Sequence, residues 1–131
     1  MKNIIKNFRI EKTGLLKWIL NILKKKKIFF ANSLQQACIP AILRGSDLLL
    51  FSRTGTGKTL SYILPSIQII DMNIYINQII VLIPTQELGL QIYDMYSTFS
   101  KNRSFKTYFI SNEMKNMKNF NLQKNQIKKK C

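Results

Sequence analysis

Residues 47–59 read Asp-Leu-Leu-Leu-Phe-Ser-Arg-Thr-Gly-Thr-Gly-Lys-Thr, and this stretch decides the fold. Its first five residues are almost wholly apolar, which is typical of a short buried parallel strand. The six residues from Ser52 to Gly57 are mostly small, and an apolar helix is predicted to follow over residues 58–70. A buried strand, a glycine-containing loop and a helix, in that order, are the context that a phosphate-binding loop requires.

The loop has the residues that this chemistry needs: Ser52, Arg53, Thr54, Gly55, Thr56, Gly57, Lys58 and Thr59. Glycines let backbone N–H groups converge on phosphate oxygens, and the helix N-terminus adds a favourable dipole. We expect Lys58 to reach the β- and γ-phosphates and the Thr59 hydroxyl to bind Mg²⁺. The strict pattern begins with Gly, whereas Ser52 stands here. The alternative is a chance Gly/Thr turn before a helix.

The flanking sequence predicts alternating helices and strands. A basic amphipathic helix is expected over residues 13–27 with Thr13 as its N-cap, and Pro40 predicts a bend or an early end in the next helix. The other predicted elements are a helix over 33–44, strands over 47–51, 78–83 and 106–110, and a helix over 87–100. This order is typical of an α/β fold with a parallel sheet between two helical layers.

Composition excludes several classes of protein. The 131 residues are one domain's length, with 46% apolar and 21% charged residues, which excludes a wholly disordered or collagen-like chain. No apolar run is long enough to span a bilayer, and two cysteines make no disulfide framework. We therefore expect an intracellular protein of the cytoplasm or nucleus, neither secreted nor bound to a membrane. The absence of histidine excludes imidazole catalysis and histidine-bearing metal sites.

The net charge of +15 is concentrated at the two ends of the chain. Residues 1–27 and 101–131 each carry nine basic side chains and one acid, whereas residues 28–100 are close to neutral. Basic ends suit nucleic-acid binding, but a bias toward Lys, Ile and Asn explains the size of the charge equally well. We divide the chain into a basic arm with an amphipathic helix (1–27), a nucleotide-binding region (28–111) and a Lys/Asn-rich tail (112–131). Disorder is expected in the tail, and RNA binding is the alternative.

Several spaced motifs together resemble the N-terminal part of the first RecA-like domain of the DEAD-box RNA helicases. The resemblance covers about residues 8–111 and identifies the chain as an incomplete, three-layer α/β domain of that type. The matching stretches are Ser52–Thr59 (motif I), Gln35 in Asn-Ser-Leu-Gln-Gln-Ala-Cys-Ile-Pro (Q motif), Gly45-Ser46-Asp47, Leu64-Pro65, and residues 84–91, Pro-Thr-Gln-Glu-Leu-Gly-Leu-Gln (motif Ia).

The resemblance implies that the chain binds ATP and Mg²⁺ and that RNA is its partner, with proteins of RNA metabolism as possible further partners. The Gln35 amide offers a donor and an acceptor together, which suits adenine. The family stacks an aromatic residue seven positions before this Gln, where Ile28 stands here; either stacking is weaker or the loop shifts and brings Phe29 to the base. Motif Ia implies RNA contacts from residues Pro84, Thr85, Gln86 and Glu87. Gln86 replaces the usual Arg, which should lower RNA affinity and its salt dependence.

The chain lacks the acidic Asp-Glu-Ala-Asp run and the Ser-Ala-Thr motif of the family. Phosphoryl transfer needs an acid that holds Mg²⁺ and positions water, and an arginine that stabilises the transition state. We therefore expect a fragment of an ATP-dependent RNA helicase that cannot hydrolyse ATP by itself. The alternative is a non-catalytic basic RNA-binding or assembly protein derived from a helicase. A small P-loop kinase is a third possibility, but it would not need Gln35 at this spacing.

Overall fold

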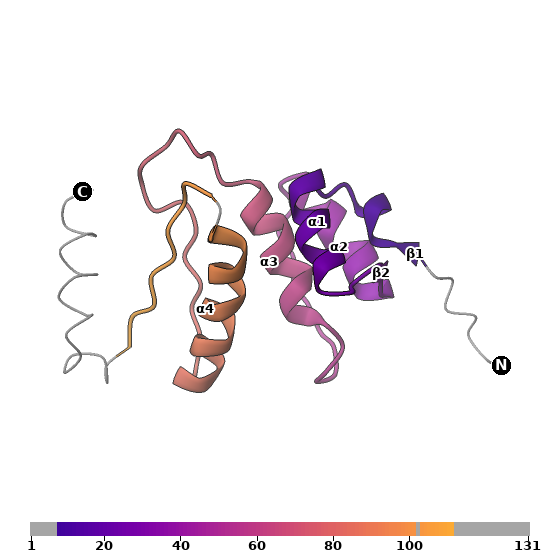
Figure 1. The fold of residues 1–131 in the computed structure, drawn as a ribbon. Coiled ribbons are helices and arrows are strands. Elements are labelled where there is room, and N and C mark those ends of the chain that lie inside the picture. The colour runs from indigo at the N-terminus through magenta and orange to yellow at the C-terminus, as the bar shows by residue number, and fades with distance from the viewer. Residues whose placement is uncertain (1–7, 102, 112–131) are drawn as a thin grey trace. The chain divides into compact units, whose positions relative to one another are not determined.

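The computed structural model describes residues 8–101 and 103–111. The chain divides into two compact units, with the boundary between Ile69 and Ile70. Figure 1 follows the elements of both units along the chain. The tail over residues 112–131 and the first residues of the basic arm lie outside the described residues, so the expectations for them stay predictions.

The first unit is mostly helical and contains the one strand pair of the described residues. Strands β1 (Phe8–Arg9) and β2 (Phe30–Ala31) pair antiparallel, with Phe8 opposite Ala31 and Arg9 opposite Phe30. The other elements are the 3₁₀ helix η1 (Ile10–Thr13) and the helices α1 (Lys17–Lys25), α2 (Ser33–Leu43) and α3 (Lys58–Gln68).

The core of the first unit comes from one face of each helix. Helix α2 packs against α3, and the side chains with almost no exposed surface are Ile19, Leu23, Ile39, Ile63, Leu64 and Ile67. Each such aliphatic side chain stabilises the fold by about 1.5–3 kcal/mol. The Gln68 amide joins the end of α3 to the turn before α1, because it accepts from the Leu16 N–H at 2.8 Å and donates to the Gly14 carbonyl at 3.0 Å.

The expected cap at Thr13 is wrong, and of the two alternatives for Pro40 the early end of the helix is wrong. Thr13 does not cap the first long helix: its buried hydroxyl donates to the Ile10 carbonyl inside η1, and α1 begins four residues later at Lys17. Gly14, with φ +88°, separates the two helices, since a left-handed residue cannot continue a right-handed one. Pro40 does not end α2, which runs on to Leu43 because its packing against α3 outweighs one missing backbone hydrogen bond.

The second unit contains one described helix, α4 (Gln86–Ser100), which confirms the helix predicted over 87–100. Its buried residues are Gly89, Ile92, Tyr96 and Phe99. The Tyr93 ring lies against the Phe109 ring with centroids 6.2 Å apart. The Gln78 side-chain amide holds the loop before the helix together. It accepts a hydrogen bond from the Asp71 N–H and donates to the carbonyls of Asp71 and Ile74.

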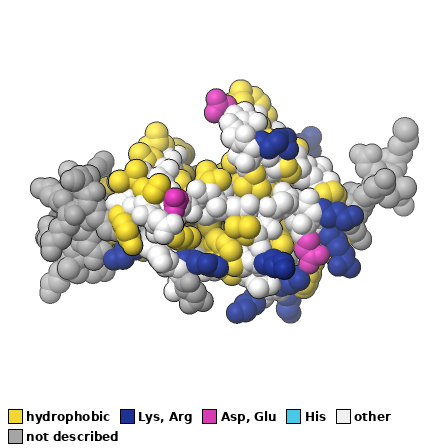
Figure 2. Space-filling model, turned by 90° about the horizontal axis from the view of Figure 1, so that it is seen from above, with side chains coloured by type: hydrophobic (Ala, Val, Ile, Leu, Met, Phe, Trp, Pro, Cys, Tyr) yellow, Lys and Arg dark blue, Asp and Glu magenta, His cyan; other side chains and the backbone are white. Residues whose placement is uncertain are grey.

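The three segments predicted as strands, residues 47–51, 78–83 and 106–110, form no ladder within the described residues. Several of their apolar side chains are exposed, with Phe51 at 84% and Leu82 at 91%, and hydrophobic side chains reach the surface in Figure 2. A strand exists only through hydrogen bonds to a neighbour, and a parallel strand also needs cover on both faces. The sequence supplies the apolar residues for these strands, but the described residues do not supply the pairing.

Candidate functional site

The predicted phosphate-binding loop lies directly before α3, as the sequence requires. Gly55 and Gly57 have φ of +75° and +79°, so both occupy the left-handed region that favours glycine. Gly57 is the N-cap of α3, and its carbonyl accepts the helix's first hydrogen bond, from the Ser61 N–H at 3.4 Å. The N–H groups of Lys58 and Thr59 in the first turn therefore have no partner within the helix and are available to an anion.

The loop folds around the ammonium group of Lys58. Its Nζ donates to the Ser52 carbonyl at 2.6 Å and to the Arg53 carbonyl at 2.7 Å. The Thr56 hydroxyl donates to the Arg53 carbonyl at 2.9 Å and also shares a hydrogen bond with the Ser52 hydroxyl. Ser52, Lys58 and Thr59 are half-buried, whereas residues 53–56 are exposed. A cation held under an exposed loop, next to free helix N–H groups, fits the phosphates of a nucleotide.

Gln35 lies against this loop, although it is 22 residues from Gly57 in the sequence. Its side chain is buried, with 5% exposed, and its Nε2 donates to the Gly57 carbonyl at 3.5 Å. Its Oε1 accepts from the Asn32 backbone N–H at 3.2 Å. The structure therefore brings Gln35 and the loop together. Contact between Gln35 and adenine stays a prediction.

Asn32 is a member of the same cluster that the sequence analysis missed. Its Oδ1 accepts from the Gln35 N–H at 2.9 Å, which completes a capping box at the start of α2, and its Nδ2 donates to the Thr56 carbonyl at 2.8 Å. The signal was an Asn three residues before a Gln at a predicted helix start. A Cβ on Gly57 would lie 2.7 Å from Asn32 Nδ2 and 2.9 Å from Gln35 Nε2, so a side chain there would displace both amides and strain the backbone at φ +79°.

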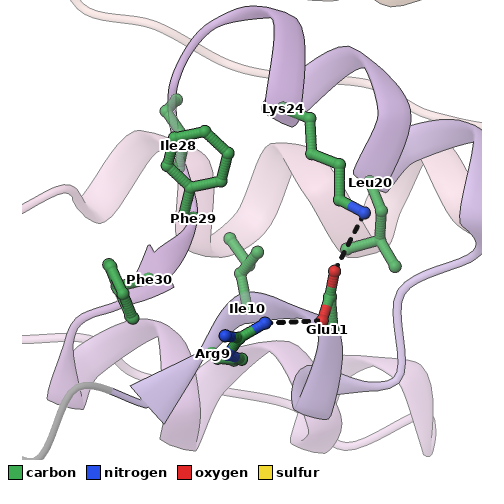
Figure 3. Close-up of a pocket in the computed structure, with 8 residues that line it drawn as sticks. All are labelled: Arg9, Ile10, Glu11, Leu20, Lys24, Ile28, Phe29 and Phe30. Carbon is green, nitrogen blue, oxygen red and sulfur yellow. Dashed lines mark ion pairs between the residues drawn. The ribbon is translucent and has the colours of Figure 1, made fainter.

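Phe29 does not join this cluster in the described structure. Its half-exposed ring lines a cavity of about 260 Å³ with Ile28 and Phe30, and neither Gln35 nor any loop residue lines that cavity (Figure 3). Stacking of Phe29 on adenine stays a prediction without support from this geometry.

The residues predicted to touch RNA, Pro84 to Glu87, lie at the start of α4 in the second unit. Pro84, Thr85 and Glu87 are exposed, and Gln86 is half-buried. The Thr85 hydroxyl accepts from the Leu88 N–H at 3.4 Å and is the N-cap of the helix. An exposed helix N-terminus presents N–H groups that suit a phosphate.

No acidic group assembles into a metal site in the described part of the chain. No group of three or more Asp, Glu, Cys or His side chains could hold a metal ion there, which leaves Thr59 as the predicted ligand of Mg²⁺. Residues 8–101 and 103–111 also contain no helix with the length and apolar character to cross a membrane.

The loop follows an apolar segment and is followed by a helix, which is the local context that a P-loop requires. A model of the DEAD/DEAH box helicase family matches residues 32–130. The chain therefore belongs to the DEAD/DEAH box helicase family.

Individual relatives agree with this assignment. The chain is 40% identical over 88 residues to "ATP-dependent RNA helicase DeaD" of Buchnera aphidicola subsp. Schizaphis graminum, a match that covers 67% of this chain and 15% of the relative. It is 36% identical over 94 residues to "ATP-dependent RNA helicase dbp8" of Aspergillus terreus, covering 72% of this chain and 18% of the relative.

The fold class is confirmed by a solved structure. A DEAD box protein from the hyperthermophile Methanococcus jannaschii matches 91% of this chain and 32% of its own, with a TM-score of 0.74 at 27% identity. The fold is therefore a partial α/β domain of the RecA-like helicase type. The chain spans less than a third of each relative's length.

Proposed function

We propose that this chain binds ATP with Mg²⁺ at the cluster formed by the Ser52–Thr59 loop, Gln35 and Asn32, as the nucleotide-binding part of an ATP-dependent RNA helicase. The observation that carries the proposal is the pair of hydrogen bonds from Asn32 and Gln35 to the carbonyls of Thr56 and Gly57. These bonds join the predicted adenine-binding segment to the predicted phosphate-binding loop.

Each group in the cluster has a distinct task. The Lys58 ammonium would exchange its bonds to two loop carbonyls for bonds to phosphate oxygens, which are stronger because both partners are charged. The first-turn N–H groups of α3 would hold further oxygens. Thr59 would provide its hydroxyl to Mg²⁺, which neutralises phosphate charge when bound. Gln35, held by Asn32, would present its amide to the base.

We propose RNA as the partner of α4's N-terminus, through the Thr85 hydroxyl and the N–H groups of the first turn. Gln86 and Glu87 add no positive charge there, so the contact should be weak and only slightly salt-dependent. The 131 residues contain no Asp-Glu-Ala-Asp run. We therefore expect this chain alone to bind ATP without hydrolysing it, and RNA-stimulated phosphate release from the pure chain would refute that expectation.

Titration with a fluorescent ATP analogue and Mg²⁺ tests the nucleotide site. Lys58→Ala should abolish binding, whereas Lys17→Ala, which removes an exposed lysine of α1, should not. Gln35→Ala should reduce the preference for ATP over GTP. Gln36→Ala is the matched control, because that amide donates to the Ala31 carbonyl and not to the loop. Equal nucleotide affinity in Lys58→Ala and Lys17→Ala would refute the proposal.

RNA binding distinguishes the proposal from its alternative. In a helicase fragment, ATP should change RNA affinity, and Lys58→Ala should remove that change. An RNA affinity that changes neither with ATP nor in Lys58→Ala would favour a non-catalytic RNA-binding protein.

A further inference from the structure

The cavity beside β2 is separate from the nucleotide cluster and has its own chemistry. In Figure 3 the Phe29 and Phe30 side chains lie to the left of the ionic group that Arg9, Glu11 and Lys24 form, and all five residues line the cavity. Phe29 is 49% and Phe30 is 50% exposed, so both rings present a free aromatic surface. The remaining wall is aliphatic and includes Ile28.

Two cations and one acid line the cavity, so its lining carries a net positive charge. Lys24 Nζ lies 3.0 Å from a Glu11 oxygen, and Arg9 Nη1 lies 3.9 Å from the other. The hydrogen bond and the charge of Lys24 lower the pKa of Glu11, so the carboxylate stays ionised at neutral pH. Arg9 and Lys24 are exposed, and so are Lys25, Lys26 and Lys27, which follow Lys24 in the chain. Figure 2 shows basic side chains gathered around an acidic one at the right-hand end of the molecule.

The chain turns sharply between the lysine run at the end of α1 and the two phenylalanines. Lys27 has φ +59°, a left-handed conformation that a side-chain-bearing residue adopts only under constraint. The Lys27 N–H donates to the Lys24 carbonyl and the Ile28 N–H to the Leu23 carbonyl. This turn places the lysine run at the end of α1 directly before the two phenylalanines.

We propose that this cavity is an accessory site for single-stranded nucleic acid, with a base stacked on Phe29 and Phe30 and the adjoining phosphates on the Lys24–Lys27 run. Exposed aromatic faces beside cations are the combination that holds single strands. The Glu11 carboxylate accepts hydrogen bonds, so it favours a base with an exocyclic amino group, such as cytosine, over uracil. An acidic peptide also complements the lysines, but its carboxylates do not stack on aromatic rings as a base does.

Fluorescence anisotropy of the full chain with labelled oligo(C) and oligo(U) tests this site without nucleotide, so it is independent of the proposed ATP site. Phe29→Ala and Phe30→Ala should each weaken oligo(C) binding about tenfold, the order of magnitude of one stacked base. Phe51→Ala is the matched control, because this phenylalanine is 84% exposed and does not line the cavity. The loss should persist at raised salt, since stacking is not an ionic interaction.

Two charge variants sharpen the test. Lys24→Gln should weaken binding more than Lys17→Gln does at low salt, and the difference should shrink at high salt. Glu11→Gln should reduce the preference for oligo(C) over oligo(U). Ultraviolet cross-linking of oligo(C) to the wild-type chain should label the peptide that contains residues 28–30, which supplies a readout even where a phenylalanine variant fails to fold.

Three results would overturn the proposal. The first is equal oligo(C) affinity in folded Phe29→Ala, Phe30→Ala and Phe51→Ala. The second is cross-linking that leaves residues 28–30 unlabelled. The third is polyglutamate binding that is lost in Phe29→Ala while oligo(C) binding is kept, which would assign the cavity to a protein partner.

Discussion

Each unit contains an aliphatic segment, but one is buried within a helix and the other is partly exposed outside regular secondary structure. Residues 60–67 of the first unit lie in α3, where Ile63, Leu64 and Ile67 are fully buried. Residues 78–83 of the second unit read Gln-Ile-Ile-Val-Leu-Ile, and Ile80 and Leu82 are among its exposed side chains. A helix satisfies its backbone within its own segment and needs only one covered face. A strand needs a neighbour for every backbone group, so apolar residues alone do not form one.

The largest expected effect tests burial directly. Leu64→Ala should lower the free energy of unfolding by about 3 kcal/mol, because it leaves a cavity among fully buried side chains. Leu82→Ala, at a side chain that is 91% exposed, should change it by less than about 0.5 kcal/mol. Urea unfolding followed by circular dichroism measures both. Equal losses would show that residues 78–83 are as well buried as α3.

The next effect concerns the contact between the loop and α2. Gly57→Ala should cost about 2 kcal/mol, because the residue has φ +79° and the new Cβ would meet the Asn32 and Gln35 amides. Gly45→Ala isolates the backbone part of this cost, since Gly45 has φ +81° but nothing within 4 Å of its added Cβ. Its expected loss is about 1 kcal/mol. If thermal unfolding gives the same loss for both, the Asn32–Gln35–loop contact contributes nothing to stability.

A smaller effect tests packing in the second unit. Gly89 lies inside α4, where Ala is normally better by about 1 kcal/mol. Here the added Cβ would lie 2.4 Å from Cε2 of Phe109, so Gly89→Ala should be slightly destabilising. In a Phe109→Ala background the same change should instead stabilise by about 1 kcal/mol. A double-mutant cycle measures this coupling. Stabilisation by Gly89→Ala in both backgrounds would mean that Phe109 does not pack on the helix.

The smallest effect is the pH dependence of the exposed Glu11–Lys24 pair. Lys24 lowers the pKa of Glu11 below its ordinary value of 4.5, so the folded state favours the ionised carboxylate. That contribution is fully present above pH 4.5 and is lost as the pH falls through the folded-state pKa. Wild type should therefore be slightly more stable than Lys24→Gln above pH 4.5, and this difference in the free energy of unfolding should shrink as the pH falls below 4.5. Added salt should reduce the difference as well. NMR titration of the Glu11 carboxyl measures it; an unchanged pKa in Lys24→Gln would exclude the pair as its cause.

Much of the site could be predicted from local sequence. The Ser52–Thr59 loop is a contiguous stretch, and its own glycines and lysine and the helix that follows set its conformation. Gln35 is identified by its spacing in the sequence before Lys58. The helices over 33–44, 58–70 and 87–100 were predicted to within a few residues, since helical periodicity is a local signal. The contact of Asn32 with Thr56 and the position of Phe29 in a separate cavity could not be predicted, because both depend on how distant segments meet.

The sequence by itself therefore determined three of the helices, the position of the Ser52–Thr59 loop and the family, because these follow from short-range backbone chemistry and motif spacing. The tertiary structure alone decided which apolar segments are buried, that Gln35 and Asn32 lie on the loop, and that Phe29 and Phe30 face a basic cavity. Burial and long-range hydrogen bonds depend on the partner that a segment meets, and no single segment encodes its partner.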